Sequence, residues 1–150
     1  MTLDEWVDQH RGDLRPDSPR PETIHVLLEV ADRELRDAES VWSDDGRLEH
    51  AFASCLAAAS AALAACGYRV RKGAPSHHYR RLESLVYTLG LSLNDVQELQ
   101  EFRKKRSRSM YEQVGVVTRT EADAAVTAAR RLRREVSAWL AREHPELTET

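Results

Sequence analysis

Five basic side chains occupy six consecutive positions near the end of one amphipathic segment. The stretch reads Arg103-Lys104-Lys105-Arg106-Ser107-Arg108-Ser109-Met110-Tyr111-Glu112. Lys and Arg attract phosphate, and the hydroxyl groups of Ser107, Ser109 and Tyr111 can hydrogen-bond to it. The stretch therefore favours contact with a phosphate-bearing ligand. The alternative interpretation is a solvated helix end, in which the cations complement the negative pole of the helix.

Two adjacent histidines form a second group that can do chemistry. His77 and His78 follow a turn at Gly73-Ala74-Pro75 and begin a predicted helix, with two arginines one turn further on. A helix N-terminus favours anions and neutral imidazole, so this pair can touch phosphate or exchange a proton near neutral pH. The alternative is a structural role, in which the histidines only hydrogen-bond to a neighbouring loop.

Metal and cofactor chemistry find little support in the sequence. Glu22 and His25 have the Glu-x-x-His spacing of di-iron bundles, but such a site needs a second pair, and the next helix offers only Glu49-His50. The chain lacks His-Glu-x-x-His, a glycine-rich phosphate loop and Gly-x-Ser-x-Gly. We therefore expect no metal and no cofactor.

The two cysteines are expected to be buried thiols. Cys55 and Cys66 lie eleven positions apart in one predicted helix, which places them on one face but about 16 Å apart along the axis. That separation is too long for a disulfide. The alternative is a redox or metal-binding pair, which would need a Cys-x-x-Cys motif or a histidine partner nearby.

Composition indicates one domain. The chain has 150 residues, of which 41% are hydrophobic and 31% charged, with a formal net charge of −3. The basic stretch is therefore a local feature of a mildly acidic protein. We find no apolar run long enough to cross a bilayer and no secretory signal at the N-terminus, so we expect a cytoplasmic protein without membrane contact.

The periodicity of apolar residues predicts helices throughout and no strand. Thr2 and Glu5 have capping-box spacing, which predicts a short helix to about Gln9 before a proline-containing linker. Residues 1–20 are thus a short helix and linker, residues 21–145 a helical bundle, and residues 146–150 a tail. Thr118 and Glu121 form a second predicted capping box, and Pro145 ends the last helix.

Four longer helices are predicted from stripes of apolar residues, with a shorter one between them. The first stripe runs from Ile24 to Trp42, and the second, rich in alanine, runs from Leu48 to Cys66 and ends at Gly67. Small residues on several faces would allow neighbouring helices to approach closely, so this second helix should be central. A third helix begins after Ser76 and a fourth after Ser92 or Asn94. We expect an all-α, up-and-down bundle of four to five helices.

The order of these features resembles the HEPN superfamily, the small all-helical domains named for nucleotide binding in higher eukaryotes and prokaryotes. An alanine-rich helix ends in Gly67-Tyr68-Arg69, His77-His78 begin a helix that continues with Leu82-Glu83-Ser84-Leu85, and Arg103-x-x-Arg106-Ser107-x-x-x-Tyr111 precedes a helix opening with Thr118 and Glu121. The resemblance covers roughly residues 21–140.

This resemblance implies a homodimer in which two copies of a short motif face each other across a cleft. In active members the motif is an arginine, often a polar residue, and then a histidine after four to six positions, and it cleaves RNA without metal. Carried onto this chain, Arg106 is the arginine and Ser107 the polar residue. Tyr111 stands where histidine is expected. Because an ordinary tyrosine has a pKa of about 10, it is a poor general base near pH 7.

We therefore expect a HEPN-like homodimer that binds RNA or a nucleotide at a basic cleft and has weak or lost ribonuclease activity. Arg106 and Tyr111 are the candidate catalytic residues, and the candidate binding residues are Arg103, Lys104, Ser107, Arg108, His77 and His78. Many HEPN proteins resemble the toxin of a toxin–antitoxin pair, which implies a nucleotidyltransferase antitoxin as a partner. In some of them a tyrosine near the motif is modified, but Gln113 occupies the corresponding position here. The alternative is a non-catalytic helical module that binds another protein.

The predicted dimer needs apolar surface. We expect Trp42 or Trp139 to be exposed and to supply part of a symmetric contact, together with the alanine-rich helix.

Overall fold

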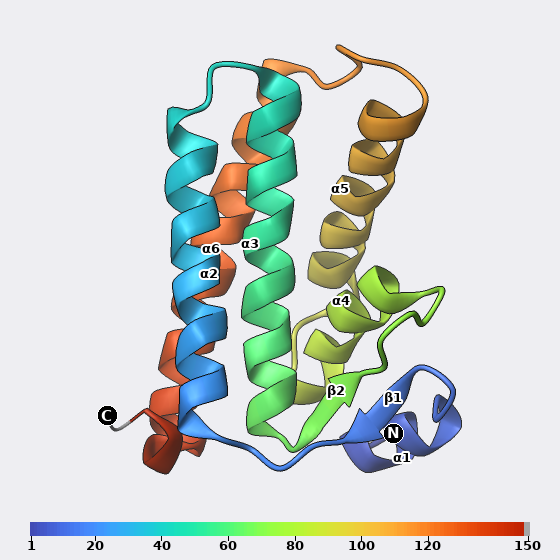
Figure 1. Ribbon diagram of the computed structural model, residues 1–150, viewed down its shortest axis with the longest axis vertical. Coiled ribbons are helices and arrows are strands. Elements are labelled where there is room, and N and C mark those ends of the chain that lie inside the picture. Colours follow the sequence, from blue (N-terminus) through green and yellow to red (C-terminus); the bar gives the residue numbers. More distant parts are fainter. Residues whose placement is uncertain (149–150) are drawn as a thin grey trace.

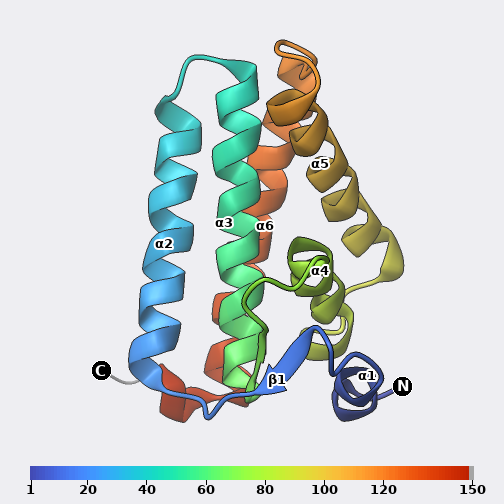
Figure 2. The same cartoon turned by 45° about the vertical axis from the view of Figure 1, so that its right-hand side comes forward.

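The chain folds as an all-α bundle, which confirms the predicted fold class. A computed structural model describes residues 1–148. Its elements, in chain order, are α1 (Leu3–Gln9), β1 (Leu14–Pro16), α2 (Pro21–Ser40), α3 (Asp44–Ala65), β2 (Tyr68–Val70), α4 (His77–Thr88), α5 (Leu93–Tyr111), α6 (Arg119–Glu143) and a 3₁₀ turn, η1 (Pro145–Leu147). Helices α2, α3 and α6 stand side by side, and α5 lies beyond them with the short α4 at its base (Figures 1 and 2).

Side-chain caps fix where several helices begin. The hydroxyls of Thr2, Ser43, Ser92 and Thr118 each accept a hydrogen bond from the backbone N–H three residues later. Thr118 and Glu121 complete the predicted capping box of α6, since the Glu121 side chain also accepts from the backbone N–H of Thr118. Each cap satisfies a donor that the helix itself cannot pair.

Helix α3 is the central element, as its alanines predicted. Nine of the side chains it buries are smaller than leucine: Ala51, Ser54, Cys55, Ala57, Ala58, Ala59, Ala61, Ala62 and Ala65. This helix is also long and apolar enough to cross a membrane, contrary to the expectation that no such run exists, but 67% of its most apolar window is buried in the bundle. Packing against the other helices therefore accounts for its apolar composition.

The N-terminal segment contains a strand that the sequence did not predict. β1 pairs with β2 in a two-stranded antiparallel sheet, with Leu14 opposite Val70. At three residues each, these strands are too short for a two-residue alternation to be recognised. Leu14 and Val70 are buried together with Trp6, Val7 and Leu63 in a small second core, so residues 1–20 are packed against the bundle rather than forming a free linker.

This N-terminal segment also fixes α4. The indole N–H of Trp6 donates to Glu83 at 2.8 Å, and Arg80 bridges Asp13 at 2.9 Å and Glu83 at 2.7 Å. These contacts hold the helix that begins with the two histidines.

Of the two tryptophans, one of which was expected to be exposed, Trp42 is exposed and Trp139 is buried. Trp42 lies in the connection between α2 and α3 and is 91% exposed. It therefore does not belong to the buried apolar stripe of α2, contrary to the sequence prediction, but it is available for a contact with another molecule. Trp139 is 6% exposed and belongs to the core, because its position on α6 faces the bundle. In the predicted tail, Leu147 of η1 is buried against the same core, and residues 149–150 lie outside the described residues.

Candidate anion-binding site

Most of the predicted site residues line one hollow between the start of α4 and the second half of α5. The hollow has a volume of about 570 Å³. Its lining consists of Pro75, Ser76, His77, His78, Tyr79, Arg103, Arg106, Ser107 and Tyr111. Two groups that lie about thirty positions apart in the sequence, the histidine pair and the arginine stretch, are thus neighbours in the fold. Six of the eight predicted site residues meet here.

Arg106 is fixed in this hollow by two side chains of α3. Its Nε lies 3.2 Å from Oε2 of Glu49, and its Nη2 donates to Oε1 of the same carboxylate at 3.3 Å. The guanidinium also lies 5.6 Å from the centre of the Phe52 ring. The side chain of Arg106 is 19% exposed. Glu49 therefore largely balances the charge of Arg106, and Glu49 and Phe52 of α3 together fix the orientation of its guanidinium.

Arg103 is fixed differently and keeps its charge unbalanced. Its Nε donates to Oε1 of the buried Gln100 at 2.8 Å, and Nε2 of Gln100 donates to the backbone carbonyl of Tyr79 at 3.1 Å. The guanidinium stacks 5.5 Å from the Tyr79 ring centre. Among residues 1–148, no carboxylate pairs with Arg103. Its guanidinium is thus oriented by neutral groups and remains available to an anion.

The two histidines are neutral at physiological pH. Burial lowers the pKa of His78 to about 4, and the neighbouring His77 and arginines, Arg106 first among these, act in the same direction. Burial also lowers the pKa of His77, helped by Arg81, whose Nη1 lies 3.1 Å from Nδ1 of His77. The ring centres are 3.9 Å apart. This side of the hollow is therefore cationic through its arginines and not through its imidazoles.

The first turn of α4 opens into the same hollow. Ser76 occupies the N-cap position, as predicted, but its side chain makes no capping hydrogen bond. The backbone N–H groups of His78 and Tyr79 have no acceptor among residues 1–148. These donors, like the arginines, favour an anion.

The remaining predicted residues lie at the rim or outside. Ser107 lines the hollow and is exposed, and Tyr111 stands at the edge with 75% of its surface exposed. Lys104 is paired with Glu101 at 3.3 Å on the solvent face of α5, and Arg108 is exposed there too. Neither Lys104 nor Arg108 lines the hollow, so their proposed binding role remains a prediction.

Four residues that orient the arginines were not predicted from the sequence to belong to the site. Glu49 and Phe52 lie on α3, more than fifty positions before Arg106, and only the packing of α3 against α5 brings them together. Tyr79 and Gln100 lie on α4 and α5 and carry no charge of their own. A signal existed for Gln100, because it is a polar residue three positions before Arg103 on an apolar stripe with Val96 and Leu99.

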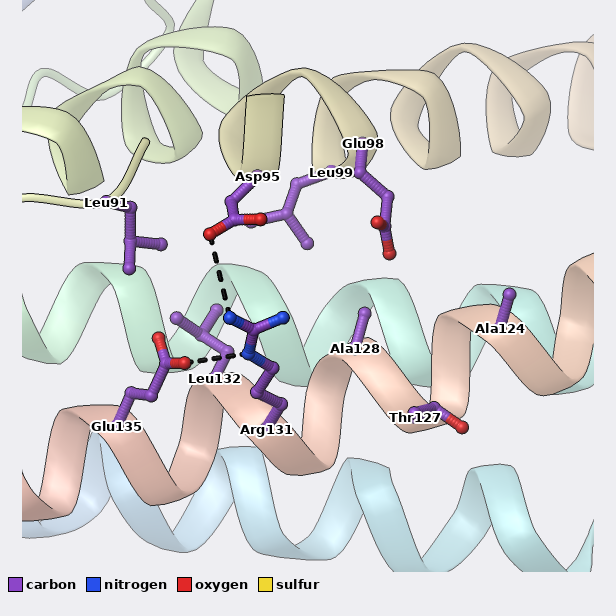
Figure 3. A pocket seen from close by; sticks show the side chains of 10 residues that line it. All are labelled: Leu91, Asp95, Glu98, Leu99, Ala124, Thr127, Ala128, Arg131, Leu132 and Glu135. Atoms are coloured by element: carbon purple, nitrogen blue, oxygen red, sulfur yellow. Dashed lines mark hydrogen bonds and ion pairs between the residues drawn. The ribbon is translucent and has the colours of Figure 1, made fainter. Parts of the chain in front are cut away.

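A second hollow, of about 250 Å³, lies between α5 and α6 (Figure 3). Its floor is apolar and includes Leu91, Leu99, Ala128 and Leu132, while its rim carries Asp95, Glu98, Arg131 and Glu135. Arg131 lies across it, with Nε 2.8 Å from Glu135 and Nη2 3.7 Å from Asp95. Because one arginine faces three carboxylates, this rim is acidic, opposite in sign to the first hollow.

The prediction of two buried thiols holds for Cys55 but only in part for Cys66. Both are free, Cys55 buried and Cys66 partly buried. Burial raises the pKa of Cys55 to about 12 and that of Cys66 to about 11.

Comparisons with known proteins add no further guide to this site. No protein-family model, no curated protein and no solved structure matches the chain.

Proposed function

We propose that this protein is a HEPN-like domain that binds a phosphate group of RNA or of a nucleotide in the hollow between α4 and α5. The observation that supports this most directly is Arg103. Its guanidinium is held by Gln100 and Tyr79, has no carboxylate partner among residues 1–148 and lines a hollow large enough for a nucleotide. A phosphate there would receive charge-assisted hydrogen bonds.

Neighbouring groups suit the rest of a nucleotide. Ser107 and the open N–H groups of α4 can donate to the phosphate oxygens. The exposed ring of Tyr111 offers a face on which a base can stack, as aromatic residues do in proteins that bind single strands. The arrangement needs no cofactor.

We propose binding rather than efficient cleavage. Tyr111 replaces the expected motif histidine, and Arg106 already has its charge balanced by Glu49. The nearby imidazole of His78 does not replace the missing histidine as a general base, because a group with a pKa of about 4 is a weak base at neutral pH. Any ribonuclease activity should therefore be slow and should depend on Arg106 for stabilising charge in the transition state.

The proposal includes a homodimer that acts in the cytoplasm, with a nucleotidyltransferase antitoxin as a further partner. Support for the dimer comes from exposed apolar side chains at and just after the C-terminal end of α5, where Tyr111 lines the hollow. Met110, Tyr111 and Val114 are 47%, 75% and 88% exposed at the end of α5. A second copy packed there would bring two hollows together across one interface.

Binding is tested by titrating labelled single-stranded RNA at two salt concentrations. We expect Arg103→Gln to weaken binding at least tenfold, whereas Lys104→Gln, which removes the same charge one position along but outside the hollow, should weaken it much less. Wild-type affinity should fall with salt with a slope corresponding to about two phosphate contacts. Equal losses in the two variants would show that the hollow is not the site.

Cleavage is tested with the same RNA in the presence of a chelator. We expect slow or undetectable cleavage by the wild type and none by Arg106→Ala. Rapid cleavage that survives Arg106→Ala would contradict the assignment of Arg106.

The second candidate function, a non-catalytic protein-interaction module, is supported by the hollow between α5 and α6. Its apolar floor and acidic rim suit an apolar side chain flanked by basic residues (Figure 3). If RNA does not bind at low salt, this function becomes the better one. Light scattering of the protein mixed with a basic amphipathic peptide, compared for wild type and Ala128→Leu, would then test it, because leucine would fill the hollow.

A further inference from the structure

Two carboxylates and one imidazole converge between α2 and α3, away from both hollows. Glu34 and Asp37 lie three positions apart on α2, and His50 lies on the facing helix α3. One donor atom of each side chain lies within 4.8 Å of the other two. The closest pair is Nδ1 of His50 and Oε2 of Glu34, at 2.7 Å.

The fold places these groups together for simple reasons. Positions three apart share one face of a helix, and α2 and α3 are antiparallel neighbours joined by a short connection (Figure 1). The side chains of Glu34 and His50 are 17% and 34% exposed, so both are partly shielded from water. The three donors are thus held by two packed helices and not by a loop.

One of the two carboxylates in this group has no partner in the protein among residues 1–148. Glu34 is contacted by His50 and, at 3.2 Å, by the exposed Arg33. The carboxylate of Asp37 has no hydrogen bond or ion pair with any side chain among residues 1–148. Glu34 is therefore paired, whereas the carboxylate of Asp37, whose oxygen lies within 4.8 Å of the donor atoms of Glu34 and His50, has no partner of its own.

This donor set fits a particular class of ion. An imidazole nitrogen disfavours Mg²⁺ and Ca²⁺, which prefer oxygen ligands alone, and favours first-row transition ions such as Zn²⁺. Three protein ligands leave a coordination position for water in a tetrahedral site. Zn²⁺ requires donor atoms about 3.3 Å apart, so only small rotations of side chains that already lie within 4.8 Å are needed.

We propose that Glu34, Asp37 and His50 bind a Zn²⁺-type divalent ion that ties α2 to α3. The ion would give the carboxylate of Asp37 a cationic partner and would displace the hydrogen bond between His50 and Glu34. Because the three ligands come together only when the two helices pack, the ion stabilises the folded chain. This site is separate from the hollow between α4 and α5 and does not depend on the function proposed for it.

The test is a calorimetric titration of the chelator-treated full-length protein with ZnCl₂. We expect one saturable site per chain and a higher melting temperature with Zn²⁺. Asp37→Asn should weaken binding at least tenfold while leaving the contact between His50 and Glu34 in place. His144→Asn is the matched control, since it removes another imidazole, one beside a single carboxylate, Glu146, at 3.7 Å. That control should bind as the wild type does.

Cobalt provides a second readout that does not depend on protein stability. Co²⁺ bound by a nitrogen and two carboxylates should give visible absorption typical of a low-coordinate site, and His50→Asn should remove it. Absence of saturable Zn²⁺ binding, equal binding by wild type and Asp37→Asn, or stronger binding of Mg²⁺ than of Zn²⁺ would each overturn the proposal.

Discussion

The guanidinium of Arg106 and the carboxylate of Glu49 face each other from α5 and α3, joined by two contacts of 3.2 Å and 3.3 Å. This fork balances the charge of the arginine that the sequence marked as the centre of the motif. Arg103, one helical turn earlier, has a neutral hydrogen-bond partner, Gln100, and a neutral stacking partner, Tyr79. In the proposed function the two arginines would therefore have different tasks: Arg103 would attract the anion, while Arg106 would be held in a fixed orientation next to it.

Removing the negative charge of Glu49 should strengthen anion binding. A unit charge about 6 Å from a phosphate contributes about 0.7 kcal/mol in water, equivalent to about threefold in affinity. We therefore expect Glu49→Gln to bind single-stranded RNA about three times more tightly at low salt, measured by fluorescence anisotropy. Glu101→Gln, on the solvent face of α5, is the control and should change affinity less. Weaker binding by Glu49→Gln would mean that the orientation of Arg106 matters more than its charge.

Replacing Gln100 should loosen Arg103 without disturbing the bundle. Gln100 is 4% exposed, and its amide joins the Tyr79 carbonyl to the Arg103 guanidinium. Gln100→Leu keeps the volume but removes both hydrogen bonds, at a cost of about 1–3 kcal/mol. We expect RNA affinity to fall toward that of Arg103→Gln, while circular dichroism shows the same helix content and a melting temperature lower by several degrees.

The control for this change is the exposed glutamine one turn away. Gln97 bonds only to Glu101, so Gln97→Leu should leave both affinity and melting temperature close to those of the wild type. If Gln100→Leu bound RNA normally, Arg103 would not need its support.

Much of the fold could be predicted because it follows local rules. Helix α6 begins at the predicted capping box of Thr118 and Glu121, and α3 is central as its alanines indicated. The strands were missed because three-residue segments carry no readable alternation, and their pairing depends on contacts between Leu14 and Val70, far apart in the chain. Trp139 was misplaced because an amphipathic stripe does not show how wide the buried face will be.

The candidate site also contains some residues that could be predicted from the sequence and others that could not. The residues that would touch a ligand, such as Arg103 and His77, were recognisable from their types and spacing, and the fold brings them to one hollow. The residues that orient them could not be recognised, since Glu49 and Phe52 become neighbours of Arg106 only through helix packing. Tertiary contacts of this kind leave no local pattern in a single sequence.

The cysteines should resist thiol reagents in the folded protein. Reaction requires the thiolate, and burial raises the pKa of Cys55 to about 12 and of Cys66 to about 11. At pH 8 we expect labelling about a hundredfold slower for Cys66, and slower still for Cys55, than in the protein unfolded in guanidinium chloride. Cys66→Ser should abolish the faster of the two slow phases. Rapid labelling of the native wild type would show that the packing around α3 opens readily.

Acid should destabilise the fold through the histidines of the hollow before it does so through carboxylates. The pKa of His78 is lowered from 6.5 to about 4. Between pH 6.5 and pH 4 this histidine is therefore protonated in the unfolded chain but not in the folded chain. Stability from this group is therefore complete above pH 6.5 and is lost as the pH falls toward 4. His77, whose pKa is also lowered, acts in the same direction. Urea unfolding at pH 7 and pH 5 should show a smaller acid-induced loss for His78→Gln than for the wild type. Ser107→Ala, a change in the same hollow without a titrating group, should retain the wild-type loss, and an unchanged loss in His78→Gln would contradict the burial argument.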